Sequence, residues 1–176
     1  MRNKHRLRLP SPAAFGRKSV LLTAVWTAGL TTGFLVSTSA SQSYLLLMRR
    51  AATAPVSIVW LLAGVLLPFL CVAFATYFSK TGLIYLVCFL KAFAFMAAAG
   101  CVSIAFGSAG WLVRWLVLFT EMTTLPLFYW LSLRSLWTKG KSLPMEFGVY
   151  GAVAVMTVYL DYSYVSPFLV MLIENY

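Results

Sequence analysis

The sequence predicts an all-α polytopic membrane protein, a bundle of about five transmembrane helices. Hydrophobic residues make up 61% of the 176 positions and charged residues only 10%, whereas a soluble domain typically has about 25% charged residues. The apolar residues gather in stretches of about 20, the length that a helix needs to cross a bilayer. We therefore expect a single transmembrane helical domain over residues 19–172, preceded by a basic cytoplasmic tail over residues 1–18.

Five apolar segments follow one another, and short polar stretches separate them. Arg17 and Lys18 precede the first segment. Tight turns at residues 79–82 and 107–110 divide the second, third and fourth segments, and a polar loop followed by Pro144 precedes the fifth, because proline suits the first turn of a helix. The predicted spans are residues 19–37, 54–78, 82–107, 111–134 and 147–169.

The distribution of basic residues predicts the orientation of the chain in the membrane. Six of the fourteen Lys and Arg residues fall within the first 18 positions. Placing the N-terminus inside puts ten basic residues in the cytoplasm and two outside, and cytoplasmic segments normally carry this excess. The loop residues in this count are Lys80, Arg134, Lys139 and Lys141 inside, and Arg49 and Arg50 outside. We therefore expect a multi-pass protein of the cytoplasmic membrane, with its N-terminus inside and its C-terminus outside.

The basic N-terminal segment has two alternative interpretations. Thr38-Ser39-Ala40 resembles a signal-peptidase site after an apolar stretch, but this stretch is longer than the usual signal core, which favours an uncleaved helix. A basic arm can also bind nucleic acid, but no motif here supports that role. The partner that we expect for this segment is the anionic surface of the lipid bilayer, and not nucleic acid.

Two opposite charges interrupt the third and fourth predicted spans. Lys91 and Glu121 lie about 26 Å and about 19 Å from the turn that joins these helices, at 1.5 Å per residue. A charge at mid-bilayer costs at least about 2.5–3.5 kcal/mol on insertion scales, so such residues usually face the protein interior and pair. We expect an intramembrane ion pair that locks two helices together. The alternative is a proton or ion relay, which would have only these two residues and Asp161 as titratable groups.

Asp161 lies among tyrosines in the fifth predicted span. The tyrosines suggest an interfacial aromatic belt, in which the carboxylate reaches water. The alternative makes Asp161 the partner of Arg114, which is also expected near the outer surface.

Small residues and one proline mark the expected helix contacts. Gly29 and Gly33 form a GxxxG pattern on the first span, and Ala97 and Gly100 belong to a small-residue face on the third. Small residues let helix backbones approach closely in lipid. Pro126 should kink the fourth helix and free a carbonyl group, which neighbouring Thr hydroxyls could satisfy. The polar patch around this kink would line a groove or join helices.

The residue types that enzymes and metal sites need are scarce in this chain. The only histidine is His5 in the basic tail, and the three cysteines lie in apolar stretches without CxxC spacing. No phosphate loop, nucleotide fingerprint or nucleophile motif occurs. We expect no catalytic residues, no metal site and no cofactor. The cysteines, Cys71, Cys88 and Cys101, are interpreted as small hydrophobic residues.

The middle of the chain resembles the stage II sporulation protein M family. In residues 82–95, a glycine is followed by an apolar run that ends in Phe89-Leu90-Lys91 and then by a run rich in Phe. The glycine-flanked turn at 107–110, the Thr120-Glu121 pair before Pro126, and the glycines of the first span also fit, so the resemblance covers about residues 15–135. Ala92 departs from the family pattern, which has glycine after the lysine.

The resemblance implies a bacterial integral membrane protein without catalytic activity. It would act as a scaffold for cell-wall hydrolases that thin peptidoglycan during engulfment in sporulation. The alternative function is a permease subunit of a small membrane transporter, which would need a cytoplasmic coupling helix for its ATPase partner. The loop between Arg134 and Glu146 could supply that helix, but it is short and has no obvious amphipathic pattern.

Overall fold

The computed structural model describes residues 12–53, 57–107, 110–138 and 144–174, and within these ranges the chain is helical without strands. This architecture confirms the predicted all-α bundle. Four helical segments are long and apolar enough to cross a membrane, and a bent pair of helices provides a fifth crossing if it is counted as one span. The protein is therefore a multi-pass membrane protein.

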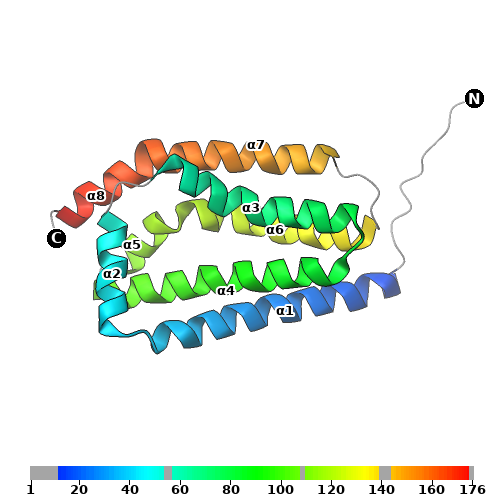
Figure 1. Ribbon diagram of the computed structural model, residues 1–176, viewed down its shortest axis with the longest axis horizontal. Helices are drawn as coiled ribbons and strands as arrows, with labels where there is room; N and C mark the ends of the chain where they lie inside the picture. The colour runs from blue at the N-terminus through cyan, green and yellow to red at the C-terminus, as the bar shows by residue number, and fades with distance from the viewer. Residues whose placement is uncertain (1–11, 54–56, 108–109, 139–143, 175–176) are drawn as a thin grey trace, which may run out of the picture.

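The long helices run side by side, and the chain passes back and forth along the bundle (Figure 1). The first pass is α1 (Pro12–Thr38), the second is α3 (Ile58–Tyr77), and the third is α4 (Thr81–Phe106). The fourth is α5 (Gly110–Val117) with α6 (Phe119–Thr138), and the fifth is α7 (Pro144–Leu160), continued by η2 (Asp161–Val165) and α8 (Ser166–Glu174). Helix α1 begins and α8 ends at opposite ends of the bundle, as an odd number of passes requires (Figure 1).

The two ends of the bundle differ in what they contain. The end at which α1 begins, called the N-terminal end below, also holds the turn between α3 and α4 and the adjoining ends of α6 and α7 (Figure 1). The opposite end, called the far end, holds α2 (Gln42–Thr53), α5 and α8. Helix α2 lies across the far end, at a steep angle to α1 and α4. This segment was expected to be part of a connection, so its helix is a difference from the prediction.

The helix bounds differ from several of the predicted span boundaries. Helix α1 begins at Pro12, inside the predicted 1–18 tail, since proline at the first helical position costs no hydrogen bond. The remaining tail, residues 1–11, lies outside the described residues. The second span is shorter than predicted, from Ile58 to Tyr77. The predicted fourth span, 111–134, is broken between α5 and α6, whose axes differ by 64°.

The turn between α3 and α4 is a tight helix cap. Ser79 adopts φ 56°, in the left-handed region. Its N–H bonds the Thr76 carbonyl at 3.1 Å, and the Lys80 N–H bonds the Ala75 carbonyl at 2.8 Å. These two bonds form a Schellman motif, with serine at the position where glycine is most common. The motif reverses the chain within three residues, Phe78, Ser79 and Lys80.

Helices α1 and α4 approach each other closely at the predicted small residues. A Cβ atom added to Gly29 would lie 2.6 Å from the Phe89 carbonyl oxygen, and one added to Gly33 would lie 3.0 Å from the Ala97 nitrogen. A Cβ on Gly100 would overlap the Ser37 hydroxyl. Gly29, Gly33, Ala97 and Gly100 therefore all lie in this contact, where only small residues fit.

A second contact region joins α3, α4, α6 and α7 through larger apolar side chains. Phe128 of α6 and Cys88 of α4 are fully buried. Phe69 of α3 stacks on Tyr150 of α7, with ring centroids 4.4 Å apart. This packing encloses the segment of α4 that carries Lys91.

Candidate functional site

The structure places Lys91 of α4 against Glu121 of α6. The Lys91 ammonium donates a hydrogen bond to Glu121 Oε1 at 2.7 Å, and Oε2 lies 2.6 Å from the same nitrogen. Only Oε1 has hydrogen-bond geometry, so the contact with Oε2 is electrostatic. Lys91 is 7% exposed and Glu121 is 25% exposed. In such a poorly hydrated position, each charge needs the other to offset its desolvation.

A third helix also contacts the lysine. Lys91 Nζ donates to the Gly64 carbonyl oxygen of α3 at 3.1 Å. In a regular helix this carbonyl would accept from the N–H four residues later, but that residue is Pro68, which has no N–H. The lysine therefore satisfies the carbonyl group that the proline leaves free. One ammonium ties α3, α4 and α6 together.

Gly64 and Pro68 were not among the predicted site residues. The signal was available, because an interior proline in a span frees the carbonyl group four residues before it. We had expected this effect only at Pro126. Identifying the partner of the Gly64 carbonyl, however, required knowing that α3 and α6 both lie beside α4.

The break between α5 and α6 changes the environment of Glu121. Glu121 lies in the first turn of α6, where the partial positive charge of a helix N-terminus favours a carboxylate. The 64° bend in this span lies at Leu118, between α5 and α6. Pro126, where the sequence predicts a kink, lies inside α6, which continues past it. The hydroxyls of Thr123 and Thr124 donate to the Phe119 and Thr120 carbonyls, a pattern that tends to bend helices.

Asp161 is buried, so the prediction that its carboxylate reaches water was wrong. It is 4% exposed and accepts a hydrogen bond from the Thr120 hydroxyl of α6. Asp161 begins η2, a π-helical turn in which its carbonyl oxygen accepts from the Ser166 N–H. The wide turn precedes Pro167, whose ring would clash with the Ser163 carbonyl in a regular α-helix. Asp161 therefore contacts Thr120, the residue that directly precedes Glu121 in α6.

The alternative pairing of Asp161 with Arg114 was also wrong. Ion pairs in the described part of the chain include Lys91–Glu121 and Arg134–Glu146, whereas Asp161 accepts from Thr120. Arg114 donates instead to the Ser103 hydroxyl at 3.4 Å, and its buried Nε has no hydrogen-bond partner among the described residues. Ser103 lies on α4, so Arg114 connects α5 to the far end of that helix.

The N-terminal end of the bundle is held by two polar contacts. Lys18 of α1 donates to the Leu136 carbonyl of α6 at 2.8 Å. This places a cation in the last turns of α6, where the helix dipole favours positive charge. Arg134 Nε lies 3.3 Å from Glu146 Oε1 and thereby joins α6 to the first turn of α7. The ends of three helices are connected at this level.

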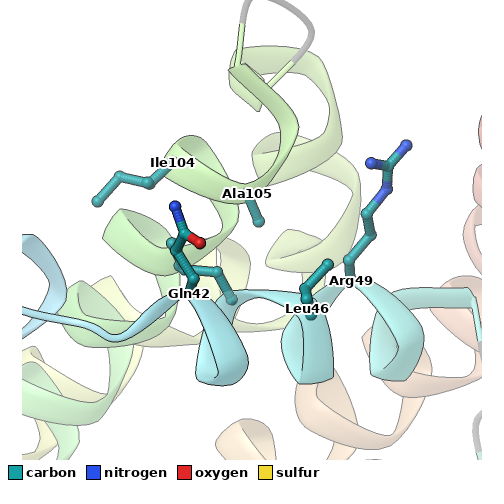
Figure 2. Close-up of a pocket in the computed structure, with 6 residues that line it drawn as sticks. Gln42, Leu46, Arg49, Ile104 and Ala105 are labelled. Carbon is teal, nitrogen blue, oxygen red and sulfur yellow. The ribbon is translucent and has the colours of Figure 1, made fainter.

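At the far end, α2 and α4 form an open groove of about 210 Å³. Gln42, Leu46 and Arg49 project from α2 toward α4, which contributes Ile104 and Ala105 (Figure 2). The Arg49 guanidinium lies 5.7 Å from the centre of the Phe106 ring, within the range of a cation–π contact. Helix α2 therefore carries two arginines, Arg49 and Arg50, together with apolar side chains at this end, as an interfacial helix does.

The described residues contain no group of three or more His, Cys, Asp or Glu side chains arranged to hold a metal ion. Cys88 and Cys101 are buried, Cys71 is half-buried, and all three are free thiols. The Lys91–Glu121 ion pair and the contact of Asp161 with Thr120 use consecutive residues of α6, Thr120 and Glu121.

Comparison with known protein families, curated proteins and solved structures found no match for this chain. The geometry of the bundle and the sequence resemblance are therefore the grounds on which a function can be proposed.

Proposed function

We propose that this protein is a non-enzymatic membrane scaffold whose buried charges hold the bundle together. The observation that carries the proposal is the arrangement around Lys91. Its ammonium has oxygen contacts from two other helices, Gly64 on α3 and Glu121 on α6. A lysine so fully coordinated within the bundle serves as a cross-link, since moving a proton or ion past it would break contacts with both helices.

The resemblance to the stage II sporulation protein M family supports a more specific role in the bacterial cytoplasmic membrane. In this proposal the N-terminus is inside, because the N-terminal end carries most of the basic residues. The far end then faces the wall, and peptidoglycan hydrolases are the proposed partners. Helices α2, α5 and α8 would form the docking platform, with exposed Tyr44, Trp111 and Phe168.

The second candidate is a permease subunit, and the break between α5 and α6 favours it. Broken helices often form substrate sites in transporters, where the N-terminus of the half-helix faces an anionic group. Here, however, the chain's own Glu121 lies at that N-terminus and is paired with Lys91. The loop between Arg134 and Glu146 also leaves little length for a coupling helix, because α6 extends to Thr138 and α7 begins at Pro144.

The orientation of the chain in the membrane separates the two candidates. In the described part of the chain, α2 is the one helix that lies across an end of the bundle (Figure 1). The scaffold needs this helix outside, whereas an ATPase partner could reach it only from inside. Cysteine would be placed singly at Ser43 in α2, at Ser142 and at Tyr176, and then labelled in intact cells with a membrane-impermeant maleimide. The scaffold proposal expects labelling at Ser43 and Tyr176 but not at Ser142. The parent chain, with its three native cysteines, is the control for background. Labelling at Ser142 alone would put α2 inside, where it could contact an ATPase, and would contradict the wall-facing scaffold.

Cross-linking from outside the cell tests the partner class. A cross-linker attached at Ser43 should capture a peptidoglycan hydrolase, identified by mass spectrometry and by wall-degrading activity. The matched control attaches the same cross-linker at Ser142. Recovery of an ATPase subunit through Ser142, with no hydrolase through Ser43, would favour the permease.

A further inference from the structure

A cavity of about 250 Å³, lined by both polar and apolar residues, lies at the N-terminal end of the bundle, between α1, α3, α4 and α6. Four hydroxyl residues and one lysine line it, and Ala75, Ile84 and Leu136 form its apolar walls. The volume is well above the roughly 15 Å³ that one water molecule needs. The polar lining residues are Lys18, Thr76, Ser79, Thr81 and Ser135.

The electrostatic character of the cavity is positive. The Lys18 ammonium has three N–H donors, and the Leu136 carbonyl accepts from one of them. Thr81 is the first residue of α4, and the preceding residue, Lys80, makes no side-chain cap. The first N–H groups of this 26-residue helix therefore combine with its dipole to favour an anion. None of the residues that line the cavity is acidic.

Ser135 provides an independent indication that the cavity takes a ligand. The residue is 4% exposed, and its hydroxyl has no hydrogen-bond partner among the described residues. Buried hydroxyls nearly always have such a partner. The Thr76 hydroxyl, by contrast, is already used, because it donates to the Val72 carbonyl of its own helix at 2.7 Å. Ser135 thus has a buried hydroxyl group without a partner, on a residue that lines the cavity.

We propose that this cavity binds a phosphate group, with Lys18, Ser135 and the N-terminus of α4 as its donors. Phosphate oxygens accept strong hydrogen bonds from ammonium, hydroxyl and backbone N–H groups. Either an anionic phospholipid headgroup or free inorganic phosphate carries this chemistry. The position at one end of a membrane-spanning bundle puts the cavity at headgroup depth. The inference does not depend on the scaffold function.

The test uses the purified full chain in detergent and measures binding by native mass spectrometry and by the shift in melting temperature. Three probes are compared: short-chain phosphatidylglycerol, inorganic phosphate, and a glucosyl diacylglycerol of the same chain length without phosphate. Phosphatidylglycerol should bind and raise the melting temperature, whereas the glycolipid should not. A comparable shift with inorganic phosphate alone would identify the free anion as the source. Equal binding of the glycolipid and phosphatidylglycerol would overturn the proposal.

Matched variants locate the site. Lys18→Gln should weaken phosphatidylglycerol binding roughly tenfold, as expected for the loss of a charged hydrogen bond. Ser135→Ala should weaken it by a smaller factor. Lys80→Gln removes the same charge at the same end from an exposed residue that does not line the cavity, so it should bind as the parent does. Melting temperatures without ligand show whether each variant is folded. Equal losses of phosphatidylglycerol binding in Lys18→Gln and Lys80→Gln would show that only the total positive charge of this end matters, and would overturn the site.

Discussion

Helix α4 is joined to its neighbours in two different ways on two of its faces. Toward α1 it presents backbone and small residues, and Gly29 and Gly33 approach its carbonyl oxygens directly. Toward α3 and α6 it presents Lys91, which is held by a carbonyl and a carboxylate. The first contact depends on shape, since lipid provides no hydrophobic drive for helix association. The second depends on charge balance, so it should tolerate paired changes but not single ones.

The largest expected effect is on the charged face. Lys91→Met should lower the free energy of unfolding by about 3–5 kcal/mol, because it leaves the half-buried Glu121 carboxylate without its partner. Thermal or denaturant unfolding in detergent measures this loss. Lys80→Met is the control, since Lys80 is exposed and surface changes usually stay within about 0.5 kcal/mol. Equal, small effects of the two substitutions would show that Lys91 is not part of a buried pair.

At the small-residue contact between α1 and α4, added side-chain volume should be enough to lower the free energy of unfolding. Gly33→Ala would press a methyl group against the Phe93 carbonyl and the Ala97 nitrogen, and overpacking of this kind costs about 1–3 kcal/mol. Gly148→Ala is the matched control, because a Cβ there meets nothing within 4 Å. In that open helical position alanine should stabilise by up to about 1 kcal/mol. If Gly33→Ala were also stabilising, the close α1–α4 contact would be contradicted.

The contact between Lys91 and Gly64 predicts a coupling with Pro68. Pro68→Ala restores the N–H that can bond the Gly64 carbonyl within α3. The resulting increase in the free energy of unfolding should be larger by about 1 kcal/mol in the Lys91→Met background, since the Gly64 carbonyl then has no other donor. Melting of the four proteins of this cycle measures the difference. An identical effect of Pro68→Ala in both backgrounds would show that the lysine does not serve this carbonyl.

The smallest expected effect lies at the α3–α4 turn, away from both contacts. Ser79→Gly should raise the free energy of unfolding by about 1 kcal/mol, because glycine adopts a positive φ without the steric cost of a Cβ. The gain should appear in Lys91→Met and Gly33→Ala backgrounds alike, since the turn is independent of both. A loss of stability would mean that the Ser79 side chain contributes more than its backbone strain costs.

Much of this architecture could be predicted because membrane-spanning helices are recognisable by their length and apolar composition. The depths of Lys91 and Glu121 could also be compared by counting residues along a hairpin. Helix α2 was missed because its mixture of leucines and arginines resembles a polar connection unless its place across the far end is known. Asp161 was misplaced because its burial depends on a π-helical turn and on Thr120 of another helix. Neither follows from local sequence.

The central claim is that Lys91 and Glu121 form one clasp, and the double variant tests it most directly. Lys91→Met and Glu121→Gln would be measured singly and together, by unfolding in detergent and by complementation of the deleted gene. We predict that the double variant recovers most of the stability lost by either single variant and supports normal function in the cell. Additive losses of stability would show that the two residues do not act as a pair. A double variant that is stable but inactive would contradict the clasp as their whole role and favour the relay.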